Sequence, residues 1–292
     1  MPDFPIIDTH LHVWDQTRLR YSAFDGHPVY GHPWHIEDYH AACRDVAVEA
    51  MVFLECYTDF TPEGGQYLEE IAFVEDEAAR DPRILGIVPM APVEWGARVE
   101  PLLRQMQQSH PKVKGIRRIV EFDADPRSLT LSDDFVAGVN LLTKFDWHFE
   151  INVNFRQMDI VHEFAARVPD VPLILDHCGK PGIAQGALDQ FRADMAALAL
   201  RPNTSIKLSG LPGYAAADWT EEDLRPYIAA TLDTFGPTRT MFGSDWPIIS
   251  TACTLPRWIA VLDRAFADLG LSQPESRAIW RDNANAFYRL GL

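Results

Sequence analysis

Residues 5–12 read Pro-Ile-Ile-Asp-Thr-His-Leu-His, a short apolar run that ends in polar side chains. The same pattern recurs along the chain, where short runs rich in apolar and β-branched residues alternate with longer stretches of helical pattern. Several runs are continuously apolar, as expected for parallel strands that are covered on both faces. We expect eight strands, at Pro5–Asp8, Ala50–Cys56, Ile84–Met90, Val113–Arg118, His148–Val153, Pro172–His177, Ser205–Ser209 and Thr240–Asp245.

The stretches between these strands show the apolar spacing of helices. Ser132, with Asp133 and Asp134 after it, is a typical N-cap with acidic residues in the first turn, and Thr220 with Asp223 resembles a capping box. The expected helices are Gly64–Arg80, Phe135–Phe145, Gln157–Val168, Gly186–Leu200, Thr220–Phe235, Leu255–Leu269 and a final amphipathic segment, Gln273–Leu290.

Strands and helices that alternate in this way over 292 residues predict an α/β protein, a single-domain (β/α)8 TIM barrel spanning residues 1–292. The last amphipathic segment is then an extra C-terminal helix. Val13–His35 is a long loop after strand one, of a length typical of binding loops and lids. A doubly wound open sheet is the alternative, but its usual Gly-rich turn after the first strand is absent.

The composition excludes some classes of function. The chain carries 26 Lys and Arg against 42 Asp and Glu, a formal net charge of −16, which argues against binding to nucleic acid. No apolar run reaches the length of about 20 residues that spans a membrane, and the first residues lack the basic start of a secretory signal. The cysteines form no CxxC pair and suit a reducing cytosol: Cys43, Cys56, Cys178 and Cys253. We therefore expect a cytoplasmic protein, and a homo-oligomer is compatible with the sequence.

Polar side chains gather at the expected carboxyl ends of the strands, where barrel enzymes carry their active sites. His10 and His12 alternate along strand one, so both imidazoles face the same side, as ligands of a divalent metal do. Asp245 ends strand eight, where an unpaired carboxylate would be costly to bury. It is a candidate general base toward water and a third metal ligand, and the alternatives are a helix cap or a structural ion pair.

The remaining candidates are groups that bind or polarise a substrate. His177 ends strand six and is a candidate for polarising a carbonyl or protonating a leaving oxygen; a structural loop histidine is the alternative. Arg117 and Arg118 point to opposite faces of strand four, so one of them is expected to reach the pocket and grip an anionic group. Further expected substrate contacts are Lys207, Glu55, Asn152 and Trp14, the last as an aromatic surface for a ring.

Four segments together carry a resemblance to a known family: Asp-Thr-His-Leu-His at 8–12, Lys-Gly-Ile-Arg-Arg at 114–118, Asp-His-Cys-Gly-Lys-Pro at 176–181 and Phe-Gly-Ser-Asp-Trp-Pro at 242–247. They resemble the amidohydrolase superfamily, most closely the amidohydrolase-2 branch with 2-pyrone-4,6-dicarboxylate lactonase and the L-fucono and L-rhamnono lactonases. The resemblance implies a (β/α)8 barrel and hydrolysis of a lactone substrate. It also implies that Asp245 activates water, and that His10 and His12 bind the metal.

The chain departs from this family at strand five. Metal-dependent members usually carry a histidine at its end, whereas residues 149–154 read Phe-Glu-Ile-Asn-Val-Asn and His148 stands at the other end. The metal set is reduced to His10, His12 and Asp245, with Glu55 as a further candidate. Such a set is expected to hold Zn²⁺ or Mn²⁺ weakly, and the missing histidine also fits the lactonases of this branch that work without metal. Two other functions remain open: a metal-dependent amidohydrolase or decarboxylase acting on a small carboxylic acid, and a barrel that only binds a ligand.

Overall fold

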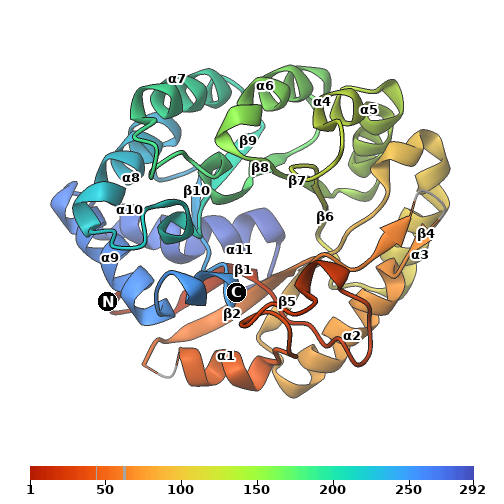
Figure 1. The fold of residues 1–292 in the computed structure, drawn as a ribbon, viewed down its shortest axis with the longest axis horizontal. Helices are drawn as coiled ribbons and strands as arrows, with labels where there is room; N and C mark the ends of the chain where they lie inside the picture. Colours follow the sequence, from red (N-terminus) through yellow and green to blue (C-terminus); the bar gives the residue numbers. More distant parts are fainter. Residues whose placement is uncertain (44, 62–63) are drawn as a thin grey trace.

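The computed structural model describes residues 1–43, 45–61 and 64–292, and eight of its strands form two parallel sheets. One sheet has three strands in the order β1-β2-β5, and the other has five in the order β10-β9-β8-β7-β6. Figure 1 shows helices arranged around these strands. The strands are β1 Ile6–Leu11, β2 Val48–Leu54, β5 Ile84–Val88, β6 Gly115–Ile119, β7 His148–Asn152, β8 Leu173–Leu175, β9 Thr204–Leu208 and β10 Thr240–Phe242.

The two sheets approach each other at both edges through isolated parallel bridges. Leu11 pairs with Trp246 at one seam, and Met90 pairs with Arg117 at the other. The sequence predicted one eight-stranded barrel, whereas the structure divides the strands into two sheets. The register of β1 against β2 shifts between Asp8 and Leu11, and β10 ends at Phe242, so a continuous ladder does not cross that seam.

Most predicted helices are present, with bounds shifted by a few residues. The N-cap of Ser132 and the capping box of Thr220 with Asp223 are confirmed, since both side chains cap the helices that follow. Three helices were not predicted, at 36–42, 100–109 and 126–130. The start of the helix predicted from Gly64 is instead strand β4 Gly64–Gly65, which pairs antiparallel with β3 Phe60–Thr61. The helices are α1 Ile36–Ala42, α2 Tyr67–Arg80, α3 Glu100–Ser109, α4 Pro126–Thr130, α5 Asp133–Asn140, α6 Met158–Arg167, α7 Leu188–Ala199, α8 Glu221–Phe235, α9 Leu255–Asp268, α10 Gln273–Arg277 and α11 Asn283–Tyr288.

The predicted C-terminal helix is a composite of α10, a π-helical turn at Ala278–Asp282, and α11. In Figure 1, α11 lies near the middle of the view, with strands of both sheets around it. Its residues Ala284 and Tyr288 are fully buried and pack with side chains from β1, β2, β5, β8 and β10. The C-terminal segment is therefore part of the core that lies inside the ring of strands.

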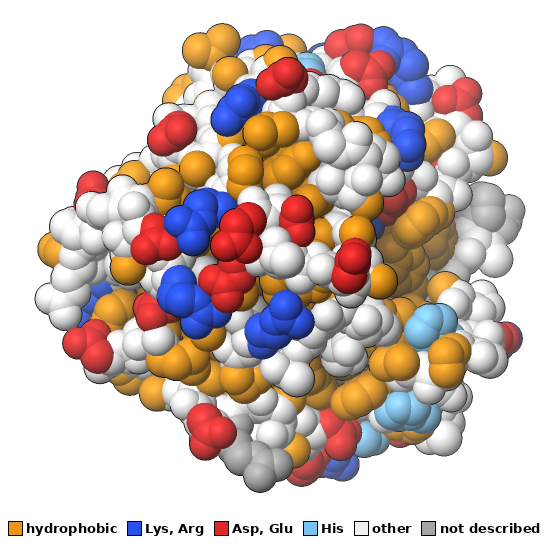
Figure 2. Space-filling view, turned by 60° about the vertical axis from the view of Figure 1, so that its left-hand side comes forward, with side chains coloured by type: hydrophobic (Ala, Val, Ile, Leu, Met, Phe, Trp, Pro, Cys, Tyr) orange, Lys and Arg blue, Asp and Glu red, His pale blue; other side chains and the backbone are white. Residues whose placement is uncertain are grey.

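The surface and the cysteines are those of an ordinary globular protein. On the face in Figure 2, acidic and basic side chains are interspersed. Cys43, Cys56, Cys178 and Cys253 are buried free thiols. Among the described residues, no helix is both long and apolar enough to span a membrane.

Candidate active site

Asp245 lies against the imidazoles of three histidines. Its Oδ1 is 3.4 Å from His12 Nε2, 3.6 Å from His10 Nε2 and 3.9 Å from His177 Nε2. The ring of His10 lies 4.9 Å from that of His12 and 4.3 Å from that of His177, measured between centroids. All four side chains are at least nine-tenths buried. Residues from the first, sixth and eighth predicted strands therefore meet at one point.

Hydrogen bonds of the backbone tie Asp245 to β1. The amide of Asp245 donates to the carbonyl of His10 at 2.9 Å, and the amide of His12 donates to the carbonyl of Trp246 at 2.8 Å. Asp8 reinforces this link, because its Oδ1 accepts from the amides of His10 and Ser244. The carboxylate in the segment 8–12 thus serves to join β1 to the segment after β10.

His177 is placed by a turn with unusual backbone geometry. Its φ is +51°, and Cys178, Gly179 and Lys180 also have positive φ. The turn ends the strand at Leu175, two residues before the predicted end, and brings the Nδ1 of His177 to 2.9 Å from Ser209 Oγ. Three of these four residues carry side chains that disfavour this region, so surrounding contacts must hold the turn, as is common at functional sites.

Burial sets the ionisation of this cluster. It lowers the pKa of His177 to about 3 and places the pKa of His10 well below its ordinary value. Burial alone would raise the pKa of Asp245, but the neighbouring His177 and His12 outweigh it and hold that pKa below its usual value. At neutral pH the site therefore presents neutral imidazoles at His10 and His177 beside the carboxylate of Asp245, the protonation states that metal binding requires.

Within this cluster, His10, His12 and Asp245 fit a divalent metal, because their ligand atoms all lie within 4.8 Å of one another. Neither ring nitrogen of His10 has a hydrogen-bond partner among the described residues, although both are buried. His12 places Nδ1 2.9 Å from the carbonyl of Leu54, and His177 places Nδ1 near Ser209, so both leave Nε2 for a ligand. Ligands about 2.0–2.1 Å from a tetrahedral ion lie about 3.4 Å apart, close to the separations from Asp245 Oδ1.

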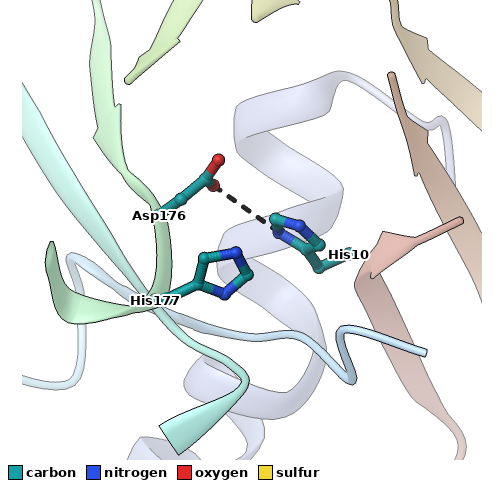
Figure 3. Close-up of side chains that lie close together, drawn as sticks. All are labelled: His10, Asp176 and His177. Atoms are coloured by element: carbon teal, nitrogen blue, oxygen red, sulfur yellow. Dashed lines mark ion pairs between the residues drawn. The ribbon is translucent and has the colours of Figure 1, made fainter. Parts of the chain in front are cut away.

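A second possible ligand group is formed by His10, His177 and Asp176. Figure 3 shows the Asp176 carboxylate directed at the ring of His10, with His177 beside it. Asp176 Oδ1 is 3.5 Å from His10 Nδ1, while its Oδ2 is 2.9 Å from Arg117 Nε, and Lys207 Nζ is 3.5 Å away. Two cations next to Asp176 oppose a metal ion there, whereas the ion pairs of Asp245 among the described residues are all with histidines.

The site opens into a cavity of about 560 Å³, a size typical of small-molecule sites. Asp245, His12 and His177 form part of its wall. Most of the remaining lining is aromatic or apolar, and Arg117 and Lys180 add two cations. The other lining residues are Ala23, Phe24, His27, Tyr30, Tyr57, Phe122, Asn152, Tyr214 and Ile248. A small, largely apolar ligand with a few polar groups suits such a cavity.

The two neighbouring arginines of β6 go to different places. Arg117 lies inside and lines the cavity, and its Nη1 donates to the carbonyl of Glu55 at 3.0 Å. Arg118 pairs with Glu94 and Asp123, both at 3.1 Å, and lies over the ring of Phe60 in a separate hollow. Strand alternation explains the difference, and Arg117 is the arginine that reaches the pocket.

Three other candidates lie near the cavity without lining it. Lys207 is fully buried and pairs with Glu150 and Asp176. Glu55 lines the separate hollow with Arg118, and its Oε2 accepts from the amide of Tyr57. Trp14 is buried in the loop after β1, where its Nε1 donates to the carbonyls of Tyr30 and His32. Asn152, by contrast, lines the cavity from the end of β7.

Several residues of the cavity wall were not predicted from the sequence. Lys180 pairs with Glu121, and its Nζ lies 5.5 Å from the centre of the exposed Phe122 ring. Tyr57 and Tyr214 are half-buried in the wall. Lys180 directly follows Asp176–Gly179 in the sequence, and only the left-handed turn returns it to the cavity. Lys180 therefore lay within a recognised motif, 176–181, but the spacing of that motif did not indicate that its side chain reaches the cavity.

Comparison with known proteins places this geometry in a family. The family model described as amidohydrolase matches residues 7–290. This chain belongs to the amidohydrolase family. An L-fucono-1,5-lactonase of Burkholderia multivorans is 31% identical over 97% of this chain and 96% of that protein. An L-rhamnono-gamma-lactonase of Scheffersomyces stipitis is 23% identical over 99% of this chain and 100% of its own length.

A solved structure extends the comparison to three dimensions. The crystal structure of an amidohydrolase from Burkholderia multivorans with bound zinc has a TM-score of 0.84 to this chain at 29% identity, covering 98% of this chain and 99% of that one. The likeness spans both sheets and the C-terminal helices. The family assignment thus applies to the whole fold as well as to the sequence.

Proposed function

We propose that this amidohydrolase is a lactonase that opens the cyclic ester of a sugar acid with water. The observation that carries the proposal is the approach of Asp245 Oδ1 to three buried imidazoles at the wall of the cavity. The similarity to an L-fucono-1,5-lactonase and to an L-rhamnono-gamma-lactonase supports the choice of a sugar-acid lactone over other cyclic esters.

We also propose that the two sheets act as one (β/α)8 barrel and that residues 1–292 are a single domain. Bridges at both seams support closure of the ring. The active-site cavity lies at the carboxyl ends of the strands, the position it takes in barrel enzymes.

The residues proposed to hold a divalent metal are His10, His12 and Asp245, with His177 as a fourth. Zn²⁺ is favoured because its usual ligands are imidazole and carboxylate, and because a similar amidohydrolase structure contains zinc. When bound, such an ion supplies Lewis acidity toward the lactone carbonyl and lowers the pKa of water at the site.

The remaining chemistry is assigned to the side chains of this chain. Asp245 accepts a proton from water, whose oxygen attacks the lactone carbonyl carbon. Arg117 and Lys180, the cations of the cavity wall, stabilise the negative charge that develops on the carbonyl oxygen. The bond between the carbonyl carbon and the ring oxygen then breaks, and the ring oxygen takes the proton from Asp245. One water is consumed, and the product is an open hydroxy acid.

The test is hydrolysis of a lactone panel followed by proton release, with and without prior treatment by a chelator. The panel contains L-fucono-1,5-lactone, L-rhamnono-gamma-lactone and 2-pyrone-4,6-dicarboxylate. We expect turnover of a sugar-acid lactone, its loss after chelation and its return with added Zn²⁺. A folded, zinc-loaded protein that hydrolyses none of these lactones faster than buffer would contradict the proposal.

A further inference from the structure

A network of buried polar side chains connects the C-terminal helix α11 to the active site. We propose that Lys207 and Tyr288 are positioning residues, which hold Asp176 against His10 and so keep the Nε2 of His10 free to face Asp245. The inference rests on the proposed function for its catalytic consequence, but its structural content concerns only the protein and its metal.

The end of this network that lies farthest from the active site is centred on Glu150 in β7. Glu150 Oε1 accepts a hydrogen bond of 2.8 Å from the hydroxyl of Tyr288 and lies 2.9 Å from His148 Nε2. Glu150 Oε2 accepts from the ammonium of Lys207. Glu150 and Tyr288 are fully buried and His148 is nearly so, and a desolvated carboxylate needs partners of this kind. The C-terminal helix thus supplies a hydrogen-bond donor inside the ring of strands.

Lys207 is the middle member of the network and lies between two carboxylates. Its Nζ contacts Glu150 on one side and is 3.5 Å from Asp176 Oδ1 on the other. The same ammonium is 5.7 Å from the centre of the Tyr288 ring. With Arg117 beside Asp176, two buried cations offset two buried anions. This balance allows four charges to be buried at nearly zero net charge.

Asp176 is the end that touches the active site. It is held on one oxygen by Arg117 at 2.9 Å and on the other by Lys207, and the latter oxygen also lies 3.5 Å from His10 Nδ1. A carboxylate facing Nδ1 favours the tautomer that carries its proton there. Nε2 is then unprotonated, 3.6 Å from Asp245 Oδ1. Carboxylates that orient a metal-binding histidine in this way raise its basicity as a ligand.

The decisive variant removes the central ion pair of the network without changing its net charge. Glu150→Gln/Lys207→Met deletes one anion and one cation, so Arg117 and Asp176 remain as a neutral pair. Tyr288→Phe removes only one hydroxyl and covers the case in which the double variant does not fold. Trp280→Phe is the control: it alters another fully buried aromatic of the C-terminal segment, whose ring contacts Phe242 and Phe266 and none of these charged groups.

Three readouts separate positioning from simple stability. The tautomer of His10 is read by NMR of protein with ¹⁵N-labelled histidine, zinc affinity by competition with a chromophoric chelator, and kcat separately from KM. We expect the double variant to lose the Nδ1-protonated tautomer and about 10–100-fold in zinc affinity and kcat, with KM little changed. Tyr288→Phe should shift in the same direction by less, and Trp280→Phe should lower only the melting temperature.

The proposal is overturned if both the double variant and Tyr288→Phe keep the wild-type His10 tautomer and zinc affinity, or if Trp280→Phe changes them equally. Failure of the lactonase proposal has a different signature, because no lactone would then be hydrolysed by wild type while the NMR and zinc measurements would still decide this inference.

Discussion

The two sheets of this protein contribute different side chains to the space between them. The three-stranded sheet contributes apolar residues, which pack with Tyr288 in a small cluster: Ile7, Ala50, Val52, Leu54 and Val88. The five-stranded sheet adds Ile174 and Met241 to that cluster, and it also contributes four charged residues, from β6, β7, the turn after β8, and β9: Arg117, Glu150, Asp176 and Lys207. The outer faces of both sheets are apolar and pack into one larger core with the helices.

This difference explains where the active site lies. Its histidines come from both sides of the seam between β1 and β10, with His10 and His12 on the apolar sheet and His177 on the charged one. Asp245 stands after β10 and joins them. The charged sheet thus orients the reacting groups, and the apolar sheet gives them a rigid, dry support.

The largest effect is expected at the seam itself, from Asp245→Asn. The amide cannot accept a proton from water, and it lacks the negative charge of the carboxylate as a metal ligand, so kcat should fall by about 10²–10⁴-fold. Stopped-flow or pH-stat measurement of proton release from the preferred lactone tests this. A variant that folds and turns over at near the wild-type rate would remove Asp245 from the mechanism.

The next effect concerns the space around that carboxylate. Gly210 has φ of +66°, and a Cβ there would lie 2.7 Å from Asp245 Oδ2 and 3.2 Å from His177 Nδ1. Gly210→Ala should therefore displace both groups and cost about 10²-fold in kcat, as misplacement by about 1 Å does. Gly213→Ala is the matched control, since a Cβ at that position meets nothing within 4 Å. Equal rates for the two variants would contradict the site geometry.

Variants of Arg117 and Arg118 in β6 test the inner face of the five-stranded sheet against its outer face. Arg117→Lys should lower kcat/KM by about tenfold or more, because Lys cannot reproduce the contacts of Arg117 with Asp176 and the carbonyl of Glu55. Arg118→Lys, whose partners Glu94 and Asp123 lie outside the cavity, should leave kcat/KM near wild type. The reverse order in steady-state kinetics would mean that Arg118 serves the substrate.

The smallest effect is expected on the apolar sheet and should appear in stability alone. Val52 is fully buried in the small cluster, and Val52→Thr places a hydroxyl there with nothing polar provided for it. We expect a loss of about 1–3 kcal/mol in the free energy of unfolding, measured by urea denaturation. The kcat of the folded variant should match wild type; a large fall would show that this sheet also takes part in catalysis.

The sequence was sufficient to predict the strands and the carboxyl-end rim, because apolar runs and polar strand ends are local patterns. It predicted that only one of Arg117 and Arg118 would face the pocket, but period-two alternation does not say which of the two faces is inside. The role of Lys207 was harder to predict. Its partners Glu150 and Asp176 lie 57 and 31 positions away, and they hold it beneath the cavity instead of in its wall.

Other misses have similar physical causes. The turn after β8 depends on left-handed backbone at residues that do not favour it, so no propensity signals the return of Lys180 to the cavity. The division into two sheets was not predicted, because hydrophobic pattern records neither the register shift within β1 nor the reduction of the pairing at both seams to isolated bridges. Trp14 was expected at the substrate but packs its own loop, since burial of its ring and hydrogen bonding of its Nε1 are both satisfied there.

The central claim is that Asp245 and the three histidines meet at one ion, and anomalous diffraction from zinc-soaked crystals tests it most directly. We predict one zinc ion about 2.0–2.1 Å from the Nε2 atoms of His10, His12 and His177 and from Asp245 Oδ1. Zinc bound instead through His10 Nδ1 and Asp176, or absent from this cluster at saturating concentration, would contradict the account.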